Sequence, residues 1–175
     1  MKMIYPLLLI PFFFSLANGA CDGFNWYHDI DINDCYFKDI AVLQAFVENS
    51  GDSLLIDMDT NFNGKIEAIE LGWQLWENGR LIHFICQEVP SPYYLYEYNC
   101  GLSGNIPENI GDLSALLKLR IDSNNLKGEI PESICELNIV QHGPYWFNLE
   151  NNQLCAPYPN CLVNKLGKQD VKNCK

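Results

Sequence analysis

One short segment of the chain, DMDTNFNGKIEAIELG, carries side-chain oxygens at alternate positions around a glycine. Calcium takes several oxygen ligands, needs a sharp turn between them and favours a final glutamate that binds through both oxygens. The segment supplies each of these features and therefore predicts a calcium site. The expected ligands are Asp59, Asn61, Asn63, the backbone carbonyl of Lys65, and Glu70.

The same segment resembles the EF-hand calcium loop, with Asp59 in the first position, Gly64 in the sixth and Glu70 in the twelfth. It departs from that pattern at Phe62, where a polar residue is usual, and no second loop is present to pair with it. The resemblance implies a structural role for calcium and a Kd at the weak extracellular end, about 10⁻⁴ to 10⁻³ M. The alternative is a polar loop between two helices, stabilised by its own side-chain hydrogen bonds.

Side chains that perform catalysis are not grouped in this sequence. His28, His83 and His142 lie in three separate segments. No serine or cysteine has a histidine and an acid at the spacing of a known motif, and no phosphate-binding loop or metalloprotease motif occurs. The sequence therefore predicts a protein that is not an enzyme.

The chain has eight cysteines, all beyond its apolar N-terminal segment. An even number behind an export signal indicates disulfide bonds, and the absence of any CxxC pair disfavours zinc. We expect Cys21–Cys35 and Cys86–Cys100, the second closing an insertion around residues 88–98. The other four cysteines allow three connectivities, of which we favour Cys135–Cys155 with Cys161–Cys174.

The N-terminus has the order of a signal peptide. Lys2 precedes an apolar run from residue 4 to residue 16, and small residues follow up to Ala20. We expect cleavage after Gly19, a protein that is secreted or held at the cell surface, and no membrane span elsewhere. A lipid anchor on Cys21 is the alternative. The chain is acidic, with 11 Lys and Arg against 22 Asp and Glu, which disfavours nucleic acid as a partner.

A repeat organises the second half of the chain. LSGNIPENIGDLSAL at 102–116 aligns with LKGEIPESICELNIV at 126–140 at a constant offset of 24 residues. Between them, the pattern LxxLxLxxNxL runs from Leu116 through Asn124 to Leu126. This pattern predicts a short strand with alternating inward apolar and outward polar residues. The amide of Asn124 is expected to bond to the backbone of the adjacent coil.

The same frame extends in both directions. After Leu126 it returns at Phe147 and ends at Leu154, four residues late, so residues 141–144 are expected to bulge outward. Before it, an earlier copy is expected at Leu81, Phe84 and Cys86. One such unit cannot bury its own apolar face, so the units must stack on one another.

The run LSGNIPENIGDLSALLKLRIDSNNLKGEIPESI resembles the plant-type leucine-rich repeat of polygalacturonase-inhibiting proteins and receptor-kinase ectodomains. Almost the whole mature chain is similar to small secreted leucine-rich-repeat proteins of marine bacteria, through CDGF…CYFKDIAVLQAFVENS, IEAIELGWQLWENGRL and the ending. The resemblance implies an α/β repeat solenoid, a short array of about three parallel strands with a helical N-terminal cap and a disulfide C-terminal cap. Analogy with the plant caps adds a rival pairing, Cys155–Cys161 with Cys135–Cys174.

Four regions follow: a signal peptide at 1–19, an N-terminal cap at 20–80, repeats at 81–154 and a cysteine-rich C-terminal cap at 155–175. Within the first cap, KDIAVLQAFVENS at 38–50 predicts an amphipathic helix that Asp39 caps and Gly51 ends. Its apolar face is expected to consist of Ile40, Leu43, Phe46 and Val47.

The outward residues of the repeat strands are expected to form one concave face. By the repeat frame they are His83, Ile85, Gln87, Lys118, Arg120, Asp122, Trp146, Asn148 and Glu150. Aromatic and arginine side chains favour interfaces, so the predicted function is a monomer that binds an extracellular protein or glycan there. The alternative is a structural cell-surface module whose face carries cross-strand charge pairs such as Arg120 with Glu150. Inhibition of a secreted hydrolase rests on the plant analogy alone.

Overall fold

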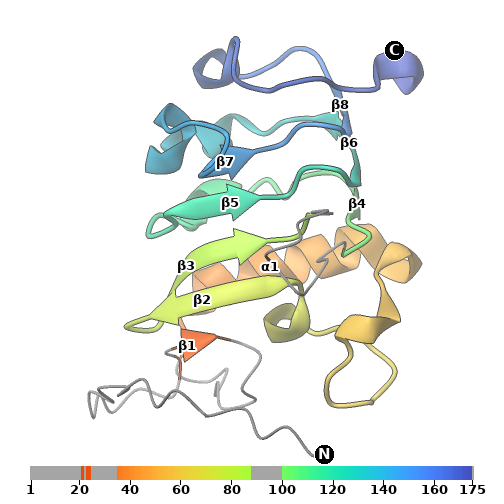
Figure 1. Cartoon of the computed structure of the whole chain (residues 1–175), viewed down its shortest axis with the longest axis vertical. Helices are drawn as coiled ribbons and strands as arrows, with labels where there is room; N and C mark the ends of the chain where they lie inside the picture. Colours follow the sequence, from red (N-terminus) through yellow and green to blue (C-terminus); the bar gives the residue numbers. More distant parts are fainter. Residues whose placement is uncertain (1–20, 22, 25–34, 88–99, 175) are drawn as a thin grey trace, which may run out of the picture.

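The computed structural model describes residues 21, 23–24, 35–87 and 100–174, so the expected signal peptide and the insertion at 88–98 lie outside the described residues. It combines a five-stranded sheet in the order β1-β2-β3-β5-β7 with a three-stranded sheet in the order β4-β6-β8. Figure 1 shows the strands of the larger sheet following one another along the long axis, with α1 and the smaller sheet beside them. The fold is therefore mixed α/β, with parallel strands in both sheets.

The elements are short and are separated by 3-10 turns. The helix α1 spans Phe37–Ser50. The strands are β1 Gly23–Phe24, β2 Trp73–Glu77, β3 Arg80–Ile85, β4 Ser103–Gly104, β5 Lys118–Arg120, β6 Asn125–Glu129, β7 Phe147–Asn148 and β8 Gln153–Cys155.

The larger sheet follows the repeat frame over its parallel part. Phe84 of β3 pairs with Leu119 of β5, and Leu119 pairs with Phe147 of β7. Each of these side chains is buried, while the residues on either side of Leu119 are partly exposed. The expected strands at these three positions are therefore confirmed, including the four-residue delay before Phe147.

Two further strands of this sheet were not expected from the sequence. β2 and β3 form an antiparallel hairpin whose turn is Asn78-Gly79, and both turn residues have positive φ angles, 51° and 73°. Asn-Gly is the preferred pair for such a two-residue turn because both positions need the left-handed conformation. β1 pairs antiparallel with the other side of β2.

The smaller sheet was not expected from the sequence, which predicted strands only along one face of the repeats. Its ladder pairs Gly104 of β4 with Leu126 of β6, and Gly128 of β6 with Leu154 of β8. The repeat alignment instead equates Gly104 with Gly128, so the ladder is displaced by two residues from the sequence offset. A shift of two leaves each side chain on the same face of the sheet, and Leu126 and Leu154 stay fully buried.

The helix agrees with its predicted span, but Asp39 does not cap it. Tyr36 occupies the N-cap position without a side-chain hydrogen bond. Asp39 is fully buried, and its carboxylate accepts hydrogen bonds from Arg80 Nε at 2.9 Å, Arg80 Nη2 at 3.1 Å and the backbone N–H of Leu81 at 2.9 Å. The residue lies on the inward face of α1, one turn too late for a cap, so it fastens the helix to β3. Gly51 ends the helix with a φ of 51°, as expected.

Buried asparagine amides connect successive coils. Asn124 Nδ2 donates to the carbonyl oxygens of Cys86 and Ile121, and Asn124 Oδ1 accepts from the N–H of Leu102 at 3.0 Å. Asn152 repeats the arrangement, accepting from the N–H of Leu126 at 3.0 Å. The role predicted for Asn124 is confirmed, and it extends to the next coil.

Gln169 takes the same role in the C-terminal region. Its Oε1 accepts from the N–H of Leu154 at 3.3 Å and its Nε2 donates to the carbonyl of Leu149 at 3.0 Å. Leu166 stands three residues before it and is buried, the same spacing as Ile121 before Asn124. The C-terminal cap therefore continues the hydrogen bonding of the repeats with a longer amide side chain.

The disulfides confirm two expected pairs and correct the other two. Cys21–Cys35 and Cys86–Cys100 are present as predicted. The remaining bonds are Cys135–Cys161 and Cys155–Cys174, so both the favoured pairing and its rival are wrong. The reason is packing: the 3-10 turn at 132–136 lies against the turn at 160–162, and β8 lies against the turn at 171–173.

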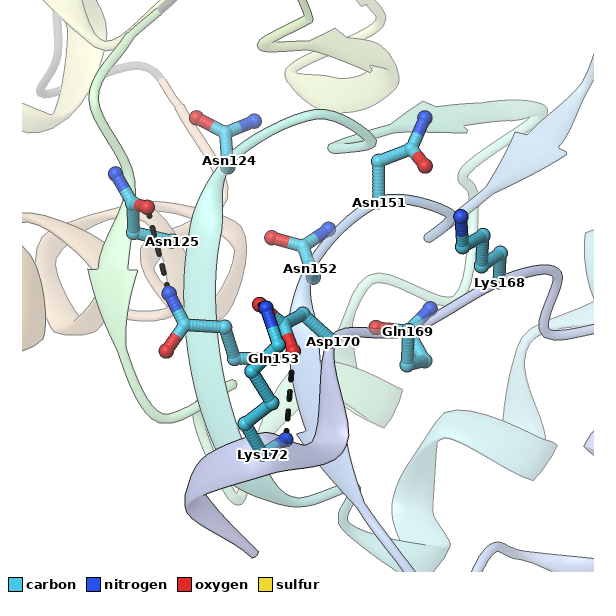
Figure 2. A pocket seen from close by; sticks show the side chains of 9 residues that line it. All are labelled: Asn124, Asn125, Asn151, Asn152, Gln153, Lys168, Gln169, Asp170 and Lys172. Carbon is cyan, nitrogen blue, oxygen red and sulfur yellow. Dashed lines mark hydrogen bonds and ion pairs between the residues drawn. The ribbon is translucent and has the colours of Figure 1, made fainter.

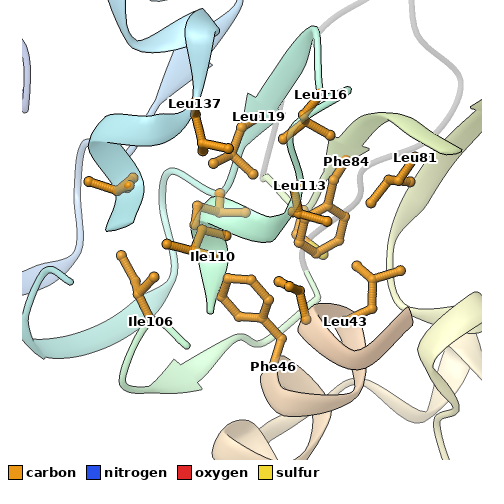
Figure 3. Packing of buried hydrophobic residues seen from close by; sticks show 14 of the residues in the cluster. Leu43, Phe46, Leu81, Phe84, Ile106, Ile110, Leu113, Leu116, Leu119 and Leu137 are labelled. Carbon is orange, nitrogen blue, oxygen red and sulfur yellow. The ribbon is translucent and has the colours of Figure 1, made fainter. Parts of the chain in front are cut away.

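The core is one cluster of buried side chains that come from the helix and from both sheets. Figure 3 shows Phe46 of α1 facing Phe84 of β3 among the leucines and isoleucines of the repeats, and the two ring centroids are 5.6 Å apart. Both rings are fully buried, and truncating a buried phenylalanine to alanine costs about 3–5 kcal/mol. The helix thus covers the apolar end of the repeat core, as the sequence suggested.

Candidate functional site

The outer face of the larger sheet presents the residues expected to bind. β3 contributes His83 and β5 contributes Lys118, which pair directly in the parallel ladder. Trp146 immediately precedes β7, and its carbonyl accepts from the N–H of Leu119. We call the exposed side of β2, β3, β5 and β7 the sheet face.

Rings lie against one another across one end of this face. Trp73 and His83 stack with ring centroids 5.9 Å apart, His83 meets Trp146 edge-on at 6.5 Å, and Trp146 meets Tyr145 at 5.1 Å. The side chains of Tyr145 and Trp146 are 57% and 41% exposed. These four residues together with Lys118 are called the aromatic end.

Trp73 and Tyr145 were missed at the sequence level. Trp73 lies on the unexpected strand β2, and the Asn78-Gly79 turn signal with the alternating sequence before it would have revealed that strand. Tyr145 directly follows the expected bulge at 141–144, whose residues are exposed. The bulge places Tyr145 at the edge of the face, which a fixed repeat frame does not anticipate.

Lys118 points its ammonium group at these rings. Its Nζ lies 3.9 Å from the centroid of Tyr145 and 5.8 Å from that of Trp146. Burial, and then the charge of Arg120, lower the pKa of Lys118. Burial likewise lowers the pKa of His83, with a smaller effect from Lys118. None of the described carboxylates forms an ion pair with Lys118.

The other end of the sheet face is polar and largely self-paired. Arg120 Nε lies 3.3 Å from Asp122 Oδ1 on its own strand segment, so the expected cross-strand pair with Glu150 is wrong. Burial raises the pKa of Asp122, and Arg120 opposes that shift. Glu150 packs instead towards the C-terminal cap, where its Oε1 accepts from the N–H of Lys168 at 3.5 Å.

Asn148 and Gln87 are two further members of the predicted set, and they differ in their bonding. Asn148 Oδ1 accepts from the N–H of Glu150 at 3.0 Å, so it shapes the end of the strand. Gln87 is only 7% exposed, and among the described residues its Oε1 has no hydrogen-bond donor. A buried acceptor without a donor is rare, and its burial keeps this oxygen away from a ligand on the surface of the sheet.

The acidic loop at 59–70 bonds to its own backbone. Asp59 accepts from the N–H groups of Asn63 at 3.1 Å and Gly64 at 2.7 Å. Glu70 Oε1 accepts from the N–H and hydroxyl of Thr60 and from the N–H of Asn61, and its Oε2 accepts from the N–H of Glu67. The flanks are 3-10 turns at 56–58 and 68–70, so the two helices expected around the loop are wrong.

The donor set fits calcium in part. Asp59, Asn61 and Asn63 hold side-chain oxygens within one turn, and Gly64 has a φ of 83°. Lys65 contributes its N–H to Asn63 Oδ1 at 2.9 Å. Glu70 Oε1 already accepts three hydrogen bonds. Glu70 must give up these hydrogen bonds to bind a cation through both carboxylate oxygens. Within the described ranges, no group of three His, Cys, Asp or Glu side chains is arranged to hold a metal ion.

A polar cavity of about 520 Å³ lies at the asparagine turns. Figure 2 shows amide side chains around it, with Gln153 bonded to Asn125 and Lys172 paired with Asp170. Asn124, Asn152 and Gln169 also line it, and they are the amides that bond the coils together. The cavity has no histidine or cysteine in its lining and offers no acid–base pair suited to catalysis.

Comparison with known proteins gives little beyond this geometry. No protein-family model matches the chain, and no curated protein matches it. A solved structure that matches is the complex of BIR3 and SERK2 from Arabidopsis thaliana, with 24% sequence identity and a TM-score of 0.42. The match covers 70% of this chain and 61% of that chain. Within the part of the chain that the structure describes, no helix has the length and hydropathy to cross a bilayer.

Proposed function

We propose that this chain is a short leucine-rich-repeat protein that acts outside the cytoplasm by binding a protein or glycan on its sheet face. The repeat offset of 24 residues, the parallel ladders and the amide bonds of Asn124 and Asn152 support the repeat class. Four disulfides support an oxidising compartment. The sulfur of Cys21 is already bonded to Cys35, which disfavours a lipid on that residue.

The observation that carries the binding proposal is the aromatic end. Rings from β2, β3 and the segment before β7 form one continuous set of contacts, and two of them are 41% or more exposed. Exposed Trp and Tyr side chains are enriched at binding hot spots because they bury much area with little loss of rotamer freedom. A purely structural module would instead carry a self-paired charged face, which here applies only to the Arg120–Asp122 end.

Paired variants test this proposal. Immobilised wild type is exposed to the secreted and cell-surface fraction of its source, and retained proteins and glycans are identified. The double variant Lys118→Ala/Trp146→Ala should lose the specific set, whereas Val163→Ala/Val171→Ala, at exposed positions of the C-terminal cap, should keep it. Retention of the full set by the face variant would sink the proposal and favour the structural module. A retained hydrolase that loses activity would instead favour the inhibitor function.

Calcium stabilisation of the acidic loop is a second candidate. The alternating oxygens of Asp59, Asn61 and Asn63 and the left-handed Gly64 favour it. The single loop and its departures from the EF-hand pattern make the expected Kd about 10⁻⁴ to 10⁻³ M, and the hydrogen bonds that Glu70 must give up support weak binding. Thermal melts with millimolar calcium and with chelator should differ for wild type and coincide for Glu70→Gln. A wild-type midpoint that does not move between the two buffers removes calcium from the account.

A further inference from the structure

The ammonium of Lys118 is the starting point. It is half-buried against the faces of Tyr145 and Trp146, and no described carboxylate pairs with it, although the chain has 22 acidic residues. Partial burial disfavours a charged group, and contact with the rings offsets only part of that cost. An anionic group brought by a ligand would pair with this ammonium in a charge-assisted hydrogen bond.

The rings around Lys118 define what else the ligand carries. Trp146 and Tyr145 expose large apolar surfaces, and His83 and Trp73 continue the row towards β2. Sugar rings present flat C–H faces that stack on aromatic side chains, and a row of rings suits a chain of sugars. None of these residues lines the 520 Å³ cavity, so a ligand of the aromatic end would lie on the sheet face and not in that cavity.

The polar end of the sheet face separates an acidic glycan from an acidic peptide. Arg120 is already paired with Asp122 there, so this end suits a ligand whose groups both donate and accept hydrogen bonds better than a row of side chains that only accept. Sugar hydroxyls both donate and accept, so they are compatible with the Arg120–Asp122 pair.

We therefore propose that the aromatic end binds an acidic polysaccharide. The sugar rings stack on Trp146 and Tyr145, and a carboxylate or sulfate of the ligand pairs with Lys118. This inference rests on the proposed function and specifies its ligand class. The acidic net charge of the protein, −11, opposes indiscriminate binding of polyanions, so the local geometry must supply the specificity.

Four defined probes test the ligand class by affinity electrophoresis and calorimetry at fixed ionic strength. They are a polyuronate, a sulfated polysaccharide, a neutral glucan and poly-L-glutamate. At least one of the two acidic polysaccharides should bind about tenfold tighter than the glucan and the polypeptide. The tighter of the two identifies the anion as a carboxylate or a sulfate.

Matched variants then locate the site. Lys118→Ala and Trp146→Ala should each weaken the acidic polysaccharide about tenfold, and Lys118→Arg should retain most of the affinity. Lys127→Ala makes the same charge change on β6 of the smaller sheet and should leave the affinity within about twofold.

Three outcomes overturn the proposal. Equal losses for Lys118→Ala and Lys127→Ala would mean non-specific attraction. Tighter binding of poly-L-glutamate, with the same dependence on Lys118 and Trp146, would make the ligand a polypeptide and leave the proposed function standing. Binding of none of the four probes would reject the acidic-glycan class, while the retention experiment on the face variants would still decide the proposed function.

Discussion

In two regions of the molecule, side chains form hydrogen bonds with backbone N–H and C=O groups, and these bonds have different structural effects. The asparagine turns at Asn124 and Asn152 are buried and bond backbone groups of neighbouring coils. In the acidic loop at 59–70, the carboxylates of Asp59 and Glu70 bond to groups of that same loop, and most of its residues are exposed. The first region therefore stabilises the whole array, whereas the second fixes one local shape.

The largest expected effect is at Asn152. Asn152→Ala removes the acceptor of the buried N–H of Leu126, which costs about 1–3 kcal/mol. It also removes one of two donors to each of the carbonyls of Ile121 and Leu149, which keep Asn124 and Gln169 as partners. Urea unfolding should show a loss of about 2–3 kcal/mol in the free energy of unfolding. Asn125→Ala, at an exposed neighbour, should cost under about 0.5 kcal/mol. Equal losses of stability for Asn152→Ala and Asn125→Ala would contradict the stabilising role of the asparagine turns.

Glu70→Ala should cost less than Asn152→Ala. It removes the acceptor for the N–H groups of Thr60, Asn61 and Glu67, but water can reach the exposed Thr60, Asn61 and Glu67. With chelator present, urea unfolding should show a loss of about 1 kcal/mol in the free energy of unfolding. A loss as large as that of Asn152→Ala would show that the loop stabilises the whole fold.

Phe62→Gly should stabilise the protein slightly. Phe62 is 90% exposed and has a φ of 59°, a conformation that costs a bulky residue about 1–2 kcal/mol. Glycine removes that cost and returns part of it through greater freedom of the unfolded chain, so the expected net gain is under about 1 kcal/mol. A lower thermal midpoint for Phe62→Gly would mean that the phenylalanine contributes to the loop.

The pH dependence of the sheet face gives the smallest effect. Burial lowers the pKa of His83 below its ordinary value of 6.5. Between the two values the unfolded chain binds a proton that the folded chain does not, so the free energy of unfolding falls as the pH drops below 6.5. His83→Gln should flatten that fall in urea unfolding measured from neutral pH to mildly acidic pH. An identical slope in both proteins would contradict the burial of His83.

The sequence predicted the features that recur from one repeat unit to the next. Phe84, Leu119 and Phe147 fall in one register, and Asn124 bonds between coils, because each follows from a fixed frame and an alternating strand. The helix at 37–50 followed from its apolar spacing.

Features set by packing between turns could not be read from that frame. The pairing of Cys135 with Cys161 depends on which 3-10 turns touch, and spacing does not encode this. Gln169 takes the bonding role of an asparagine only because the C-terminal segment folds back against the coil that contains Leu154. Three of the five residues of the aromatic end, His83, Lys118 and Trp146, were expected on one face. Trp73 and Tyr145 reach the same face through the hairpin of β2 and β3 and the bulge at residues 141–144.

The central claim is that the aromatic end of the sheet face is the binding site. Hydrogen–deuterium exchange of the wild type, with and without a saturating acidic polysaccharide, tests it most directly. The account predicts slower exchange at 117–120 and 145–148 in the presence of the polysaccharide, with the acidic loop at 59–70 and the cavity residues at 168–172 unchanged. Protection confined to the loop or to the cavity, with the aromatic end exchanging as before, would contradict it.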